Sequence, residues 1–119
     1  MLSTAGREQE ARSIARRLVD ERLAACVNIV GPIRSVYRWR GAVEEEPEFL
    51  LLIKTRASLL GRLERRLIEL HSYELPEMLA FAPRAGSAAY LAWLLESTVS
   101  KPPRSAPRAE QGRRGRGRR

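Results

Sequence analysis

The segment from His71 to Glu77 gathers the side chains with the widest chemical capability in this chain. It offers the imidazole of His71, the phenol of Tyr73 and the carboxylates of Glu74 and Glu77. Groups of this kind bind divalent metals or polar small molecules. A structural interpretation is also open, in which Pro76 stops a helix, His71 offsets the helix dipole and Tyr73 is packed with its hydroxyl hydrogen-bonded.

An enzymatic interpretation would combine this loop with Lys54 as acid and base groups. The sequence indicates no substrate class for such an enzyme, and no residue pattern pairs Cys26 with His71 as nucleophile and base. Cys26 opens an apolar strand, where a cysteine is usually a small core side chain. We therefore expect no catalytic residue and no enzymatic activity.

A long β-hairpin over residues 33–55 is the main element that could position the loop. Its first arm alternates two sets of side chains, Ile33, Ser35, Tyr37 and Trp39 against Arg34, Val36, Arg38 and Arg40. Gly41 supplies the positive φ of a tight turn. The second arm begins with Glu44 to Glu46, which could pair with the arginines and fix the register.

The second arm ends in an apolar run, Phe49 to Ile53, typical of a strand covered on both faces. Pro47 cannot donate a hydrogen bond to a neighbouring strand, so it predicts a bulge or a lapse in pairing with one neighbour. A hairpin of this length exceeds what one small domain needs. We expect another subunit to cover part of it.

The aromatic residues Tyr37, Trp39 and Trp93 are interpreted first as packing at such an interface and second as ligand-binding groups. The basic residues near the hairpin predict a solvated face paired with its glutamates. The alternative is that they line an intersubunit cleft for an anion. These basic residues are Arg34, Arg38, Arg40, Lys54 and Arg56.

Helical periodicity predicts three helices around the hairpin. The first runs from Arg7 to Leu23, and the second runs from a cap at Ser58 to Leu70. The third opens at Ser87, with apolar cover from Tyr90, Leu91, Trp93, Leu94 and Leu95. Short strands are predicted over residues 26–30, ending at a bend at Gly31-Pro32, and over residues 78–82.

With a strand before the first helix, the order becomes β-α-β-β-α-β, the α+β ferredoxin-like arrangement, followed by a C-terminal helix. Only Met1 to Thr4 are available for that strand, which is interior to the sheet in this topology. We hypothesise that the natural protein begins upstream of Met1. The alternative is a four-residue stub whose deficit is made up by assembly.

Charge divides the chain into two regions. Residues 101–119 hold eight of the 22 Lys and Arg residues and one of the 14 Asp and Glu residues. Residues 1–100 are therefore predicted to form a nearly neutral domain, and residues 101–119 a disordered Arg/Gly/Pro-rich tail. The tail is either an inert solubilising extension or a weak, salt-sensitive contact for nucleic acid, strengthened by avidity in an oligomer.

No apolar run approaches the roughly 20 residues needed to span a bilayer, and the first residues lack the order of a secretory signal. A single cysteine fits a reducing compartment. We expect a cytoplasmic protein with no membrane partner.

Four segments together resemble the CutA divalent-cation tolerance family. They are LVDERLAACVNIV (18–30), SVYRWRGAVEEEPEFLLLIKT (35–55), LHSYELPE (70–77) and AYLAWLLEST (89–98). The resemblance implies a ferredoxin-like homotrimer of PII-like architecture, linked to tolerance of copper and other heavy metals, with no established catalysed reaction. It covers nearly all of residues 1–100.

The resemblance also implies a metal-ligand set that this sequence only partly retains. Ser3 stands in the place of a cysteine ligand and Leu70 in the place of one histidine, which leaves His71 as the candidate metal ligand. A tight transition-metal site usually has three or four soft or imidazole ligands, more than one subunit supplies here. Three copies of His71 would meet only near a three-fold axis. Divalent copper, another divalent metal or a small ligand between subunits remains the expectation.

Overall fold

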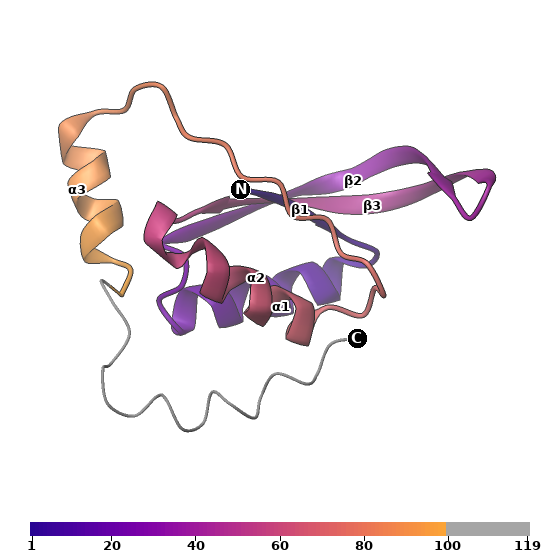
Figure 1. Cartoon of the computed structure of the whole chain (residues 1–119), viewed down its shortest axis with the longest axis horizontal. Helices are drawn as coiled ribbons and strands as arrows, with labels where there is room; N and C mark the ends of the chain where they lie inside the picture. Colours follow the sequence, from indigo (N-terminus) through magenta and orange to yellow (C-terminus); the bar gives the residue numbers. More distant parts are fainter. Residues whose placement is uncertain (100–119) are drawn as a thin grey trace.

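The computed structural model describes residues 1–99, which form a β-sheet with two helices packed on one of its faces (Figure 1). The elements are β1 (Leu2–Ala5), α1 (Glu8–Asp20), β2 (Cys26–Trp39), β3 (Ala42–Lys54), the 3₁₀ helix η1 (Ala57–Leu59), α2 (Leu60–Leu70) and α3 (Ala88–Glu96). The strand order is β1-β3-β2. The predicted α+β ferredoxin-like arrangement is confirmed. Within the described residues, no helix is long and apolar enough to cross a membrane.

The short strand β1 is bonded along both of its edges. On one side the amino group of Met1 donates to the Ile53 carbonyl at 2.8 Å, and the Ile53 N–H returns a bond of 2.8 Å to Met1. On the other side Leu2 and Leu79 exchange two backbone bonds, of 2.7 and 3.2 Å. The first few residues thus make the interior strand, and the hypothesis of an upstream start stays a prediction.

The predicted strand over residues 78–82 is wrong in extent, because only Leu79 forms a bridge, to Leu2. The physical reason is the length of β1. A strand of four residues presents only Leu2 and Thr4 toward that edge, since alternate residues point their backbone groups to opposite sides. Because Leu2 already pairs with Leu79, only Thr4 remains on this edge of β1 for a longer strand to pair with.

The hairpin follows its predicted geometry. Arg40 and Gly41 both have positive φ, 52° and 84°, and link the paired residues Trp39 and Ala42. Opposite Phe49, β2 contains the two residues Gly31 and Pro32, a two-against-one bulge. A Cβ at Gly31 would lie 2.6 Å from the Phe49 ring, so the close approach requires glycine.

Two further predictions for the hairpin are confirmed. Pro47 pairs with Arg34 of β2, and β1 reaches no further along β3 than Phe49, so pairing on its other side has lapsed. Cross-strand charge pairing occurs between Arg34 and Glu45, whose nearest atoms are 3.4 Å apart.

Helix α1 buries Ala11, Ile14 and Leu18, as the apolar stripe predicts, although it ends at Asp20, short of Leu23. Three i,i+4 ion pairs lie on its outer side: Glu8–Arg12, Arg16–Asp20 and Arg17–Glu21. The predicted cap at Ser58 is wrong. Ser58 lies inside η1, and neither η1 nor α2 begins with a side-chain cap bond, because the extended residue before the turn is Arg56.

The core lies between the sheet and the two helices, where Leu51 and Ile53 of β3 meet the buried face of α2. Leu50 and Leu52 alternate with them and lie half-buried on the opposite face. The prediction that both faces of this run are covered is therefore correct for one face only within a single chain. The other face has no helix layer in the part of the chain that the structure describes (Figure 1).

Helix α3 begins at Ser87, as predicted, and the Ser87 hydroxyl caps it by accepting from the Tyr90 N–H. None of its residues is buried, so its predicted apolar cover is not used within the chain. It stands to one side of the sheet (Figure 1), tied at its C-terminal end by Arg22 to the Glu96 carbonyl at 2.9 Å and by Arg56 to Thr98 at 2.9 Å.

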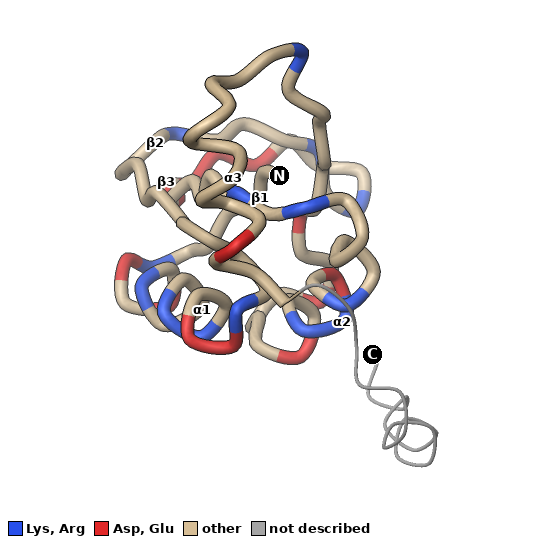
Figure 2. Tube along the Cα trace, turned by 90° about the vertical axis from the view of Figure 1, so that its left-hand side faces the viewer, with Lys and Arg blue, Asp and Glu red and all other residues tan. Residues whose placement is uncertain are grey.

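Charged residues of both signs occur along α1 and α2, whereas residues 78–87, the last part of the connection to α3, contain only Arg84 (Figure 2). The tail over residues 101–119, predicted to be disordered, lies outside the described residues.

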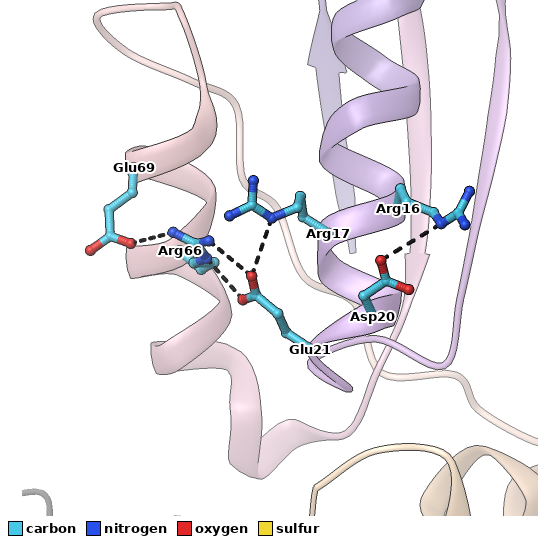
Figure 3. A network of polar contacts seen from close by, with 6 residues as sticks. All are labelled: Arg16, Arg17, Asp20, Glu21, Arg66 and Glu69. Atoms are coloured by element: carbon cyan, nitrogen blue, oxygen red, sulfur yellow. Dashed lines mark hydrogen bonds and ion pairs between the residues drawn. The ribbon is translucent and has the colours of Figure 1, made fainter.

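The end of α1 is joined to α2 by a fork of hydrogen bonds (Figure 3). Arg66 donates through two nitrogens to the two carboxylate oxygens of Glu21, both at 2.8 Å, and through a third to Glu69 at 2.9 Å. The hydrogen bond from Arg66 lowers the pKa of Glu21 below its ordinary value of 4.5. Arg66 and Glu21 are partly exposed, which moderates their contribution to stability.

Replacing Glu21 with Gln should lower the free energy of unfolding by about 0.5–1 kcal/mol at pH 7, because the fork loses its charge and one acceptor. Asp20→Asn, at the exposed pair with Arg16, is the matched control and should change it by less than about 0.5 kcal/mol. Denaturant titration measures both.

The pH dependence supplies a second check on the Glu21 fork. Since the folded pKa is lowered, the contribution is complete above pH 4.5 and disappears as the pH falls through the folded value. The difference between the wild type and Glu21→Gln should therefore shrink below pH 4.5. A difference that stays constant to lower pH would contradict the assignment.

Candidate functional site

His71, the residue that follows α2, is held at the edge of β1. Its side chain has 0% solvent exposure. Nε2 lies 2.7 Å from the Thr4 carbonyl oxygen, which can only accept, so Nε2 carries the proton. Nδ1 accepts the Tyr73 N–H at 3.0 Å. Both nitrogens of a neutral imidazole are thus used by the protein itself.

The phenol of Tyr73 reaches the base of the hairpin. Its hydroxyl donates to the Glu48 carboxylate at 2.6 Å, and Glu48 is only 8% exposed. Burial, followed by the hydrogen bond and charge of Glu48, strongly raises the pKa of Tyr73, so the hydroxyl stays protonated. A Cβ at Gly6 would lie 3.0 Å from this hydroxyl, so the small residue makes room for it.

The other polar groups of the loop fix its outer side. The Ser72 N–H donates to Glu10 of α1 at 2.8 Å. Glu74 forms an exposed ion pair of 2.9 Å with Arg40 at the hairpin turn. Glu77 is half-buried further along the loop. The loop therefore joins β1, α1 and both ends of the projecting hairpin.

Tyr37 and Trp39 lie on the hairpin and are partly exposed. Partial loss of solvent, and then the charges of Glu46 and Glu44, raise the pKa of Tyr37. The Arg40 guanidinium lies 5.1 Å from the centre of the Trp39 ring. This end of the hairpin is aromatic and acidic on the face shared with Glu48, since alternate residues share a face.

Lys54 and Trp93 are not brought to the loop within one chain. Lys54 hydrogen-bonds Asn28 and lies 4.0 Å from the Cys26 sulfur. It is six residues beyond Glu48 along β3, roughly 20 Å at the usual rise of a strand. Trp93 is on α3, 42% exposed and packed with Tyr90. The interpretation that combines Lys54 with the loop as acid and base has no geometric support within a chain.

Sequence reasoning missed Glu48, Glu10 and Thr4, the partners of the loop. Glu48 carried a signal, because it precedes the apolar run and shares its face with Leu50 and Leu52, where a lone acid needs a partner. Glu10 and the Thr4 carbonyl carried none, since their contacts depend on the tertiary fold.

Metal-binding geometry can be tested on the described residues. Over residues 1–99, no group of three or more His, Cys, Asp and Glu side chains is arranged to hold a metal ion. Cys26 lies near Lys54, away from His71. A groove of about 330 Å³ between α1 and β2 contains none of the predicted site residues. The metal and ligand assignments from the sequence stay predictions.

Comparison with known proteins adds independent information. The model of the family described as CutA1 divalent ion tolerance protein matches residues 1–97. The divalent-cation tolerance protein CutA of Thermus thermophilus is 48% identical over 98 residues, covering 82% of this chain and 95% of that protein. Protein CutA of Mus musculus is 41% identical over 97 residues. That match covers 82% of this chain and 55% of the mouse protein, so the chain spans about half its length.

Solved structures agree with the fold. The Cut A1 divalent cation tolerance protein from Thermus thermophilus has a TM-score of 0.80 at 48% identity, covering 82% of this chain and 95% of that one. CutA1 from Oryza sativa has a TM-score of 0.81 at 41% identity, covering 84% and 92%.

Tyr73→Phe should lower the free energy of unfolding by about 1–3 kcal/mol, because the buried Glu48 carboxylate loses its donor. Glu48→Gln in the same background should recover part of that loss, since a neutral amide is less costly to bury. A double-mutant cycle by denaturant titration measures the coupling. Additive single effects would show that the two side chains do not interact.

Proposed function

We propose that this chain, which belongs to the CutA1 divalent ion tolerance protein family, acts as a non-enzymatic homotrimer that supports tolerance of divalent cations. The observation that carries the proposal is the apolar surface left without a partner in one chain. It consists of the outer face of the sheet, the connection above it and α3.

In a monomer, this surface would leave many large apolar side chains exposed to water. Phe81 is 65% exposed, and every residue of α3 is exposed or half-exposed. Over the last part of the connection and α3, residues 78–96, the only charged residues are Arg84 and Glu96, whereas α1 and α2 carry many (Figure 2). Extended uncharged apolar surfaces of this kind mark interaction sites. A second and third copy of the chain are the partners that the family resemblance supports.

Assembly would also complete a ligand site. Glu74 pairs with Arg40, whose guanidinium lies over Trp39, and Tyr73 bonds Glu48 on the hairpin face that also carries Tyr37, while Lys54 and Trp93 lie apart from them. These two join the loop only if they come from a neighbouring subunit. The proposed ligand is a divalent cation, copper or another heavy metal, or a small polar molecule, bound between subunits with Glu77 at the side of the loop.

The cytoplasmic location remains part of the proposal and rests on the composition of the chain. The alternative role, contact with nucleic acid through the Arg-rich tail, concerns residues 101–119, which lie outside the described part. Filter binding of RNA by the chain with and without residues 101–119 distinguishes this role from cation tolerance. Salt-dependent binding that is lost on removal of the tail would favour the nucleic-acid role.

Sedimentation equilibrium tests the assembly. The wild type should have the mass of three 13.5 kDa chains at micromolar concentration. Trp93→Glu should shift it toward the monomer, because a charge is placed on the apolar face of α3. Ile68→Glu is the matched control, at 38% exposure on the helix layer, and should remain trimeric.

A well-folded wild-type monomer at that concentration would overturn the proposal of a trimer. Calorimetric titration of the wild type with Cu(II) and Zn(II) tests the ligand separately. Heat of binding that disappears in a monomeric Phe81→Glu variant, changed at a 65% exposed residue outside the proposed ligand set, would place the site between subunits.

A further inference from the structure

The open edge of β1 is completed by a side chain. Leu2 and Thr4 point their backbone groups to the same edge, because alternate residues of a strand do so. Leu79 bonds Leu2 at this edge. No strand among the described residues pairs with Thr4 at this edge. The Thr4 carbonyl instead accepts from Nε2 of His71 at 2.7 Å. The imidazole N–H stands where the backbone N–H of a fourth strand would be.

The other nitrogen of the same ring organises the loop. Nδ1 accepts the Tyr73 N–H at 3.0 Å, and the rings of His71 and Tyr73 pack with their centroids 4.6 Å apart. Both contacts place the Tyr73 hydroxyl on Glu48. The nearest charged group, Glu10, has its closest oxygen 3.7 Å from Nδ1, and that oxygen accepts from the Ser72 N–H. All these contacts fit a single state, a neutral imidazole protonated on Nε2.

This state leaves no lone pair for a metal ion. Coordination through Nδ1 would displace the Tyr73 N–H, and coordination through Nε2 would remove the proton that Thr4 accepts. The side chain has 0% exposure, so an ion would also have to enter a closed space. At the position where the family resemblance implies a cysteine ligand, Ser3 is buried, and its hydroxyl oxygen has no hydrogen-bond partner among the described residues. The residues present do not fit a transition-metal site centred on His71.

We propose that His71 is a structural clasp in this chain and not a metal ligand: a neutral imidazole that closes the edge of β1 and positions Tyr73 for Glu48. The proposal is independent of trimer formation and of where a cation is bound. A metal ion that reaches His71 must first open the edge of β1, so loading at this residue opposes folding.

NMR of the full chain, free of any polyhistidine tag, tests the clasp directly. The chain contains a single histidine, so ¹⁵N labelling gives one pair of ring signals. We expect a protonated Nε2 and an unprotonated Nδ1, unchanged when Zn(II) or Cu(II) is added in slight excess. A proton on Nδ1, or a metal-dependent shift or broadening of either nitrogen at one equivalent of metal, would overturn the proposal.

Two variants separate folding from coordination. His71→Gln keeps an N–H donor for Thr4, whereas His71→Ala removes both contacts. The melting temperature should fall further in His71→Ala than in His71→Gln. Calorimetric affinity for Zn(II) should be the same within about twofold in the wild type and His71→Gln, or be undetectable in both.

A tenfold or greater loss of Zn(II) affinity in His71→Gln, with the melting temperature unchanged, would show a ligand in place of a clasp. If His71→Ala does not fold, the ¹⁵N ring signals of the wild type still show whether His71 is a neutral hydrogen-bonding group or a metal ligand. Failure of the trimer in sedimentation would leave this result unaffected, because the contacts of His71 all lie within one chain.

Discussion

The structure depends on satisfying both edges of a strand only four residues long. β1 lies between β3 and the segment at Leu79, so each of its buried backbone groups needs a partner. A group left without one costs about 1–3 kcal/mol, a large share of a domain stability of about 5–15 kcal/mol. Three unlike partners supply hydrogen bonds to these groups: β3, the single residue Leu79, and the imidazole of His71. The loop after α2 is therefore part of the sheet.

This constraint extends to the projecting hairpin. Because His71 fixes the loop against β1, Tyr73 meets Glu48 and Glu74 meets Arg40, so the loop braces the hairpin at its base and at its turn. A brace of this kind orders an arm that has no helix layer beneath its far end in the described part of the chain (Figure 1). An arm held in place before association loses less conformational entropy when a second subunit covers it, which favours assembly.

Local rules predicted the parts of the fold that depend on local chemistry. The turn at Gly41, the bend at Gly31-Pro32 and the start of the third helix at Ser87 follow from neighbouring residues and are confirmed. The strand after Pro76 was predicted too long because its extent is set by β1, which is distant in sequence. The partners of the loop escaped prediction for the same reason. His71 could be singled out as important, but a helix end, a metal ligand and an edge donor look alike until Thr4 is placed beside it.

The hydrogen bonds of His71 bear on the residues found where the family resemblance implies metal ligands. Where the family resemblance implies a cysteine ligand this chain has Ser3, where it implies a histidine it has Leu70, and the imidazole of His71 is engaged by the backbone. The fold matches the Thermus thermophilus structure with a TM-score of 0.80. Function resides in sites carried by a fold, and sites can change while the fold persists. At position 71 this chain has a hydrogen-bond donor and acceptor at fixed geometry, which the edge of β1 uses whether or not any ion is bound.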